Sequence, residues 1–504
     1  MAVAVAEVAE GDTTNVVTNQ VRFSAGRLSN FYSVWEQAGA PAIVLDAVRG
    51  YQLKFSERPP LVRPSQIGSA YNTPVSADMD KYIRELLTLG AVMVVKDDIP
   101  SFISPMFLVP KPGQEKRQIF NLKALNCFLT PPKFSLYNCH KLQRVFRRDD
   151  FLSSVDLTKA YFHVSIAQNC RRFLRFMYKG QVFEFQCLPF GLSTAPFIFQ
   201  KLTSFVCQYL RKNYGIRIWN YLDDLLIAAC SKALLSQHVQ IVVNVFQMFG
   251  WIISEHKSEL IPLISAIYIG LEWSPRSNYI AVPAEKIVLL RSRIDELLTR
   301  NTWHITDLRS IIGSLNFVAF AVPLGRLHMR RLQQLIPEMR RTTRASSRVP
   351  IPTDCRKDLE WWHLHAKDRR ELFAYSPTDF LCTDASNSGW GGVLNDMRFS
   401  GIWNSTQLSL HINVKELLAV IFTVDLNFAS LHNSVVSLQL DNSTVRTYFA
   451  KEGGTKSPEL LSYLRPFLIR CTAANIVFVP YFIPGLYNCI ADSLSRSSVE
   501  CEWS

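Results

Sequence analysis

The chain has 504 residues, a formal net charge of +13 and 48% hydrophobic residues. This length exceeds what one hydrophobic core supports, and the apolar content excludes an intrinsically disordered chain. The basic balance favours a partner that carries many phosphate groups, although many basic proteins bind no nucleic acid.

The eleven cysteines are scattered along the chain, and none is paired as C-x-x-C or grouped with histidines at zinc-finger spacing. The N-terminus lacks the basic start and the long apolar stretch of a secretion signal. No apolar run approaches the roughly 18 residues that span a bilayer. We therefore expect reduced thiols in an intracellular protein of the cytoplasm or nucleus, without a membrane partner.

The first half of the chain is predicted to begin loosely and then to fold. Residues 1 to about 30 show no sustained hydrophobic period, and short apolar patches and a turn-rich stretch with several prolines follow, so we expect a partly disordered extension over residues 1–75. Apolar residues at helical spacing predict a helix from about Ala77 to Leu89. A β-rich region follows to about residue 280, with helices near 195–210 and 233–250.

The composition of the second half of the chain divides it into three segments. Residues 284–340 have a helical pattern and are rich in arginine. The stretch TTRASSRVPIPT (342–353) is rich in Ser, Thr, Arg and Pro and favours a linker. Beyond it, strand-like and helical segments alternate, which is typical of a compact α/β domain.

The segment IRIWNYLDDLLIAAC (216–230) places two adjacent aspartates, Asp223 and Asp224, between two apolar strand-like runs. One interpretation is a β-hairpin whose turn happens to contain aspartate. The favoured two-residue hairpin turns, however, use Asn-Gly or Asp-Gly, and no glycine is present here. Two carboxylates at the tip of an apolar hairpin repel each other and lose solvation, and a bound cation would offset both costs. The pair therefore indicates a metal site.

A third carboxylate comes from FLSSVDLTKAYFHVSI (151–166), where Asp156 ends an apolar strand; taken alone, this aspartate is better explained as a helix cap. Nucleotidyl transfer passes through a charged phosphoryl transition state, which two metal ions about 3.5–4 Å apart can stabilise. Mg²⁺ prefers oxygen ligands. We predict Asp156 and Asp223 as the metal ligands, with Asp224 assisting.

Between these segments, CLPFGLSTAPFIFQK (187–201) contains a Pro-Phe-Gly turn with Gly191, followed by a helix that begins with small residues. Small residues let a backbone approach a flat ligand such as a base pair. Residues 101–273 as a whole resemble the fingers and palm of reverse transcriptases. The motifs stand in the family's order: SPMFLVPKPGQEKRQIFNLKALN, VDLTKAYF, LPFGLSTAPFIFQK, YLDD, GWIISEHKSEL and YIGLEW.

The resemblance implies roles for four further residues. Lys111 and Arg117 would contact the incoming triphosphate, and Lys257 would lie near the leaving pyrophosphate; by chemistry alone all three are solvated surface cations. Tyr161 matches the aromatic residue that excludes a ribose 2′-OH, and periodicity alone explains it equally well as a core aromatic. The form VDLTKAYFHVSI, with a ribonuclease H directly after the thumb, looks closest to tyrosine-recombinase retrotransposons of the DIRS type, and gypsy-like retroelements share most of it.

Residues 380–496 hold a separate set of four carboxylates on strand ends and helix starts: Asp384, Glu416, Asp441 and Asp492. Singly, Glu416 could complete a capping box, Asp441 could cap a helix and Asp492 could lie on a solvated face. Their order and spacing resemble ribonuclease H. The resemblance implies two-metal hydrolysis of the RNA strand in an RNA–DNA hybrid.

The expected fold is an α+β right-hand polymerase of fingers, palm and thumb, followed by an α/β ribonuclease H-like domain. The expected segments are an N-terminal extension (1–75), fingers and palm (76–283), a helical thumb (284–345), a linker or connection (346–375) and a ribonuclease H domain (376–498). Each of the two sites should take two Mg²⁺ ions, for which Mn²⁺ could substitute. Their expected ligands are Asp156, Asp223, Asp224, Asp384, Glu416, Asp441 and Asp492.

The expected partners are an RNA template, a DNA primer or RNA–DNA hybrid, and dNTPs, with the thumb arginines on the phosphate backbone. Other retroelement proteins, such as a recombinase or integrase and a Gag-like protein, are expected on separate chains. Two alternatives are a pararetroviral or gypsy-like polymerase fragment and a domesticated, catalytically weak nucleic-acid-binding protein. Phe482 stands where ribonucleases H often have a histidine, which predicts slow turnover.

Overall fold

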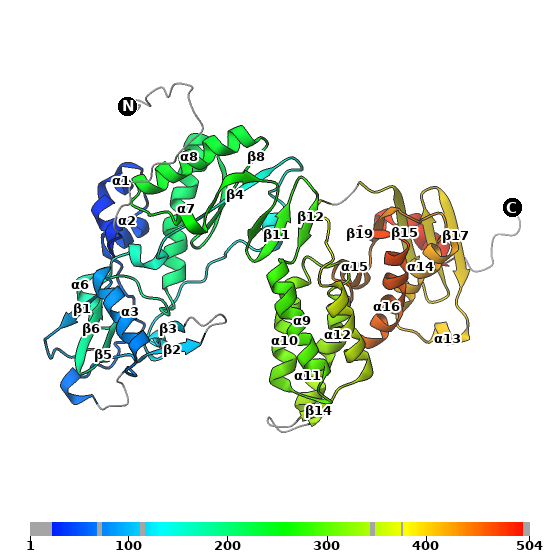
Figure 1. The fold of residues 1–504 in the computed structure, drawn as a ribbon. Coiled ribbons are helices and arrows are strands. Elements are labelled where there is room, and N and C mark those ends of the chain that lie inside the picture. The colour runs from blue at the N-terminus through cyan, green and yellow to red at the C-terminus, as the bar shows by residue number, and fades with distance from the viewer. Residues whose placement is uncertain (1–22, 68–72, 111–115, 343–347, 374–375, 497–504) are drawn as a thin grey trace, which may run out of the picture. The chain divides into compact units, whose positions relative to one another are not determined.

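The computed structural model consists of two compact units, Met1–Tyr137 with Phe151–Leu263, and Asn138–Asp150 with Ile264–Ser504. The residues that it describes are 23–67, 73–110, 116–342, 348–373 and 376–496. Figure 1 shows the fold, with many of the helices and strands labelled.

The N-terminal part of the described chain is built into the first unit. It forms η1 (Arg27–Phe31), α1 (Tyr32–Gln37) and α2 (Ala42–Gly50). Trp35 of α1 is completely buried in the core of this unit, and its indole nitrogen donates a hydrogen bond to the carbonyl of Phe249, 3.0 Å away. Where the sequence indicated a partly disordered extension, residues 27–50 therefore form short helices that contribute residues such as Leu28, Trp35 and Val48 to the core. Residues 1–22 lie outside the described part.

The next helix, α3 (Ala77–Thr88), agrees closely with the predicted one. The Ser76 hydroxyl accepts a hydrogen bond from the Met79 amide and caps the helix, and Met79, Ile83 and Leu86 form its buried face. The smaller elements around it are η2 (Pro64–Gln66), β1 (Val92–Val95), β2 (Met106–Pro110), β3 (Lys116–Phe120), α4 (Lys123–Asn126), α6 (Gln168–Arg171), β5 (Arg175–Tyr178) and β6 (Gln181–Phe185). The strands pair as β1-β6-β5 and as the β2-β3 hairpin.

The rest of the first unit is a four-stranded antiparallel sheet in the order β7-β8-β4-β9. Its elements are β4 (Phe151–Asp156), η4 (Ala160–His163), α7 (Ala195–Tyr214), β7 (Arg217–Tyr221), β8 (Asp224–Ala229), α8 (Lys232–Met248), η5 (Glu255–Lys257) and β9 (Glu259–Leu263). Helix α8 packs on β8, β4 and β9, while α7 packs on β7. The two helices match those predicted near 195–210 and 233–250.

The second unit begins with small sheets and a group of helices. These elements are α5 (Cys139–Gln143), β10 (Ala266–Tyr268), β11 (Leu271–Ser274), β12 (Tyr279–Ala281), α9 (Ala284–Leu298), β13 (Thr302–His304), α10 (Ile305–Val318), η6 (Leu327–Met329), α11 (Arg330–Thr342), β14 (Arg348–Pro350) and α12 (Thr353–His365). Helix α12 lies where a linker was expected, and it packs against α9 and α11. The arginine-rich helical region is present as predicted.

The remainder of this unit is a five-stranded mixed sheet in the order β17-β16-β15-β18-β19. Its elements are β15 (Asp379–Ala385), β16 (Gly389–Leu394), β17 (Met397–Ile402), α13 (Ser405–Leu408), α14 (Ile412–Leu426), β18 (Val435–Leu440), α15 (Ser443–Ala450), α16 (Pro458–Ala473), β19 (Val477–Phe482), η7 (Gly485–Tyr487) and α17 (Cys489–Arg496). Strand β16 is antiparallel to both β15 and β17, whereas β18 runs parallel to its neighbours β15 and β19.

Two adjacent glycines of β16 explain how helices cover both faces of this sheet. A Cβ atom on Gly391 would collide with the Ala491 carbonyl of α17, and one on Gly392 would collide with the Thr423 hydroxyl of α14. Since neighbouring strand residues point to opposite faces, the two helices lie on opposite sides of the sheet. The W-G-G sequence thus permits the close approach of the helices that carry Glu416 and Asp492.

Candidate active sites

The first carboxylate site lies where β4 and β8 meet. Asp156 is the last residue of β4, and it is paired with Asp224, the first residue of β8. Asp223 lies in the two-residue turn between β7 and β8. The three aspartates that the sequence singled out are therefore brought together from segments almost 70 residues apart.

The carboxyl groups interact strongly with one another. Burial, together with the neighbouring charges of Asp223 and Asp156, raises the pKa of Asp224 to about 6. Desolvation also raises the pKa of Asp156, and Lys257 is the main opposing influence. Three clustered carboxyls with raised pKa values are held in a costly arrangement, which a divalent cation would relieve.

Two other predicted residues lie beside this cluster. Lys257 ends η5, and its charge lowers the pKa of each of the three aspartates. Tyr161 lies in η4, and burial with the Asp223 charge raises its pKa to about 12. Its ring packs against those of Phe190 and Phe199, with centroids 4.8 and 5.1 Å away.

Gly191 adopts a left-handed conformation with φ of 97°, and a Cβ atom there would lie 2.8 Å from the Phe120 carbonyl oxygen. Asn126, which belongs to the predicted fingers motif, fixes this turn. Its Nδ2 donates a hydrogen bond to the Gly191 carbonyl, and its Oδ1 accepts one from the Ser193 amide. A glycine is therefore required by backbone packing, whatever ligand approaches it. Lys111 lies outside the described residues, and the side chain of Arg117 in β3 is not among those described.

The second carboxylate site is more compact. One carboxyl oxygen from each of Asp384, Glu416 and Asp441 lies within 4.8 Å of the others. Asp384 belongs to β15, Glu416 is the fifth residue of α14, and Asp441 follows β18. Burial raises the pKa of Glu416 to about 9, with further contributions from the charges of Asp384 and Asp441.

Unpaired buried oxygens show that this second site fits a cation. Glu416 Oε2 and Asp441 Oδ1 are buried and accept no hydrogen bond from any group in the described part of the chain. A buried acceptor without a partner is costly, and hard cations such as Mg²⁺ bind carboxylate oxygens. Asp384 is already oriented by the Ser495 hydroxyl, which donates to its Oδ2 at 2.6 Å.

The fourth carboxylate is placed differently. Asp492 lies on α17 and pairs with Arg496 one turn further along, at 2.7 Å. Its charge still raises the pKa of Asp384. Asp492 is thus near the group without belonging to the compact set of three. Asn488, which precedes it, is 2% exposed and donates to the Thr383 carbonyl at 2.9 Å, next to Asp384.

Phe482 is not a core residue. It ends β19, where it is paired with Leu440, the residue before Asp441, and it is 54% exposed. Phe482, which stands where the sequence resemblance led us to expect a histidine, is therefore paired with the strand that leads to Asp441 and has about half of its surface accessible.

Sequence reasoning missed several polar residues that contact the two sites. Besides Ser495, these include Ser258, whose hydroxyl accepts a hydrogen bond from the Asp156 amide at 3.0 Å, and Gln200 on α7, which accepts one from the Leu222 amide. Serine and glutamine are common on surfaces, so only their position in the fold distinguishes them.

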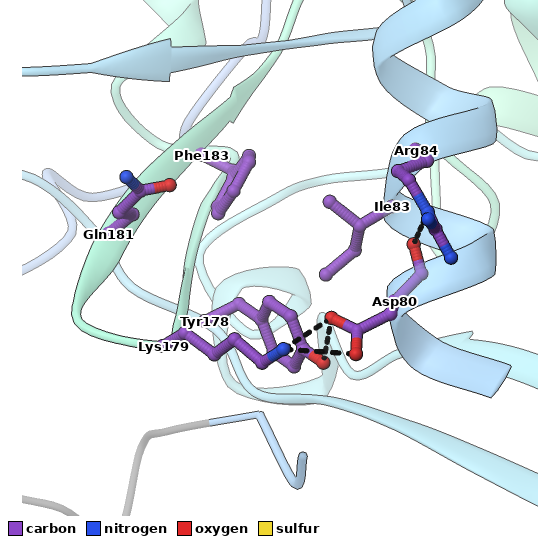
Figure 2. A pocket seen from close by; sticks show the side chains of 7 residues that line it. All are labelled: Asp80, Ile83, Arg84, Tyr178, Lys179, Gln181 and Phe183. Atoms are coloured by element: carbon purple, nitrogen blue, oxygen red, sulfur yellow. Dashed lines mark hydrogen bonds and ion pairs between the residues drawn. The ribbon is translucent and has the colours of Figure 1, made fainter. Parts of the chain in front are cut away.

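A separate hollow of about 380 Å³ lies against α3 and the β5-β6 hairpin (Figure 2). In it, Asp80 pairs with Lys179 at 2.7 Å and accepts a hydrogen bond from the Tyr178 hydroxyl at 2.8 Å. Its lining includes none of the predicted site residues. The Asp80 carboxylate is thus satisfied by Lys179 and Tyr178, while Arg84 donates to the Asp80 backbone carbonyl.

Residues 109–280 match the family model described as "Reverse transcriptase (RNA-dependent DNA polymerase)". This segment is a reverse transcriptase domain. It contains the first carboxylate site, Tyr161, Gly191 and Lys257.

The matching relatives are polyproteins. The chain is 24% identical over 448 residues to the "Enzymatic polyprotein" of Figwort mosaic virus (strain DxS), covering 82% of this chain and 61% of the relative. It is 23% identical over 414 residues to the "Transposon Tf2-3 polyprotein" of Schizosaccharomyces pombe, covering 79% of this chain and 29% of that one. The chain thus spans under two thirds of the length of either relative.

Among solved structures, the foamy viral protease-reverse transcriptase in complex with RNA/DNA hybrid is similar with a TM-score of 0.51 and 16% identity. The match covers 94% of this chain and 62% of that one. The fold is therefore that of a right-hand polymerase with a ribonuclease H-like domain, as the sequence predicted. Among the described helices, none combines the length and apolar character needed to cross a membrane.

Proposed function

We propose that this chain is the reverse transcriptase of a retrotransposon, making DNA on RNA and DNA templates and cleaving the RNA strand of RNA–DNA hybrids. The observation that carries the proposal is the meeting of Asp156, Asp223 and Asp224 at adjoining strand ends within a reverse transcriptase domain. The compact set of Asp384, Glu416 and Asp441 supports the second activity.

In DNA synthesis, Asp156 and Asp223 would hold two divalent cations with the help of Asp224. When bound, Mg²⁺ or Mn²⁺ supplies positive charge to the transferring phosphoryl group and to both reacting oxygens. Lys257 adds a positive charge on the same side, next to the position expected for the leaving pyrophosphate. Tyr161 presents a ring braced by Phe190 and Phe199, which would exclude a ribose 2′-OH by overlap.

In RNA cleavage, Asp384, Glu416 and Asp441 would hold the cations, and Asp492 would complete the set after leaving Arg496. A cation must displace the proton that Glu416 carries at neutral pH, because burial and its neighbours raise the pKa of that carboxyl. Asn488 and Ser495 keep the strand end and the Asp384 carboxylate in place.

The partners proposed are an RNA template, a DNA primer or RNA–DNA hybrid, and dNTPs. Nucleic acid bound to the similar foamy viral proteins, an RNA/DNA hybrid in one and double-stranded DNA in another, supports this proposal. Lys111 and Arg117 are proposed as contacts of the triphosphate. The VDLTKAYFHVSI motif supports a place among DIRS-type retrotransposons, with a recombinase and a Gag-like protein on other chains.

The test is extension of a labelled DNA primer on an RNA template with Mg²⁺. We expect dNTP-dependent extension by the wild-type chain and its loss in Asp223→Asn, by a factor of about 10⁴ or more, because a metal ligand is removed. A folded wild-type chain that binds the template-primer without extending it would instead favour the domesticated nucleic-acid-binding protein.

A further inference from the structure

The turn that carries Asp223 has a strained backbone. Leu222, the residue before it, has a φ of 56°, in the left-handed region that leucine disfavours. The hairpin therefore uses a turn conformation suited to glycine or asparagine while having neither. Such a conformation persists only where surrounding groups hold it.

One buried side chain holds both sides of this turn. Gln200 of α7 is 8% exposed, and its Oε1 accepts a hydrogen bond from the Leu222 amide at 2.9 Å. Its Nε2 donates to the Asn220 carbonyl at 3.3 Å and to the Ser204 hydroxyl at 3.2 Å. A single carboxamide thus bridges the strained residue and the strand that precedes it.

A second buried amide connects the same strand to the same helix. Asn220 is 2% exposed, and its Nδ2 donates to Thr203 Oγ1 at 2.9 Å and to Ser204 Oγ at 3.1 Å. Thr203 in turn donates to the Phe199 carbonyl. Because α7 and β7 are joined by this network, movement of the turn relative to the helix would break several buried hydrogen bonds.

We propose that Gln200 is a positioning residue for DNA synthesis: it fixes the left-handed Leu222 and so aims the Asp223 carboxylate at Asp156. The proposal rests on the function proposed above. The competing explanation is that Gln200 only satisfies buried polar groups and supports folding. Catalytic groups need placement to within a fraction of an ångström, so loosening the turn should slow the reaction without preventing substrate binding.

The test uses Gln200→Leu, which removes the hydrogen bonds at similar side-chain volume. We expect kcat for primer extension to fall about 10- to 100-fold, with the KM for dNTP changed less than threefold. The Mg²⁺ concentration for half-maximal extension should rise, whereas that for hybrid cleavage should not change. Gln208→Leu is the matched control, because Gln208 is exposed on the same helix.

The decisive arm is rescue by glycine. Leu222→Gly removes the conformational cost of the left-handed turn. The kcat of the double variant Gln200→Leu/Leu222→Gly should therefore be at least about threefold higher than that of Gln200→Leu. In the wild-type background the same substitution should give no gain. A role of Gln200 in helix packing alone predicts no such rescue.

If Gln200→Leu fails to fold, Gln200→Met takes its place, because methionine is unbranched and of similar length. Failure of both variants to fold overturns the proposal, and so does a folded variant with unchanged kcat or with no rescue by Leu222→Gly. A wild-type chain that does not extend primers is a different result. It would overturn the proposed reverse transcriptase function itself, and with it any catalytic role for the Gln200–Leu222 hydrogen bond.

Discussion

Asp156 and Asp224 face each other across the antiparallel strands β4 and β8, and burial, with the charges of Asp223 and Asp156, raises the pKa of Asp224 to about 6. A cation that binds below about pH 6 must therefore displace a proton at this site. At the second site the same holds up to about pH 9, because the pKa of Glu416 is raised to about 9. Burial and mutual repulsion make both groups of carboxylates costly in the absence of metal.

This arrangement predicts that metal binding and the removal of one charge each stabilise the folded chain. Mg²⁺ added to the metal-free chain should raise the melting temperature. Asp441→Asn should raise the metal-free melting temperature by a few degrees, because it removes repulsion near Asp384 and Glu416, and it should shrink the rise caused by Mg²⁺. Differential scanning fluorimetry with and without EDTA measures both effects. A metal-free melting temperature lowered by Asp441→Asn would mean that Asp441 is a structural acceptor.

Tyr161 should determine the choice of sugar. Its ring is fixed against Phe190 and Phe199, so it cannot easily move aside for a 2′-OH. Shrinking it in Tyr161→Val should raise ribonucleotide incorporation relative to dNTP by at least roughly tenfold, equal to about 1.4 kcal/mol of lost discrimination. Single-nucleotide incorporation kinetics give the ratio. Unchanged discrimination in an otherwise active variant would exclude Tyr161 from this role.

Phe482 gives a prediction about the second site. A histidine there could assist proton transfer, which is typically worth about 10²–10⁴-fold, although metal-activated water can attack without it. We expect slow hybrid cleavage by the wild-type chain and a several-fold faster steady-state rate in Phe482→His. Because Phe482 is 54% exposed, the melting temperature should hardly change. A stable variant that shows no gain in rate contradicts the prediction.

His163 should make the first unit sensitive to acid. It is fully buried; its Nδ1–H donates to the Ala160 carbonyl, and its Nε2 accepts from the Ile252 amide. Burial lowers its pKa to about 3. Below pH 6.5 His163 is therefore protonated in the unfolded chain but stays neutral in the folded chain. The free energy of unfolding consequently falls as the pH falls.

Between pH 6.5 and 5 this loss should reach about 2 kcal/mol. His163→Gln should remove it and flatten the dependence of the melting temperature on pH, whereas His432→Gln, at an exposed histidine of the second unit, should not. Thermal unfolding at several pH values makes the comparison. Equal slopes for the wild type and His163→Gln would show that His163 is not the group responsible.

The sequence predicted those parts of the structure in which a chemical role or a helical period requires particular types of residue. Aspartates such as Asp223 and Asp384 lie next to apolar strand segments, where a carboxylate loses solvation. This unfavourable placement can be recognised from the sequence alone. The helix Ala77–Thr88 was predictable because apolar residues recur at helical spacing along it, and the structure adds the Ser76 cap.

Other parts depend on tertiary contacts that no local pattern reveals. Helices α1 and α2 have 6 and 9 residues, too few to show a period, and their place is set by burial of residues such as Trp35. Helix α12 begins at the end of a Ser-, Thr- and Pro-rich stretch whose composition indicated a linker. Asp492 was predicted from motif order, but its pairing with Arg496 depends on side-chain conformation.

The most direct test of the two-site account is one reaction that reports both activities. A DNA primer and its RNA template carry different labels, and the wild type is compared with Asp223→Asn and Asp441→Asn. We expect the wild type to extend the primer and cut the RNA, Asp223→Asn only to cut the RNA, and Asp441→Asn only to extend the primer. Loss of both activities in either folded variant would contradict the existence of two independent metal sites.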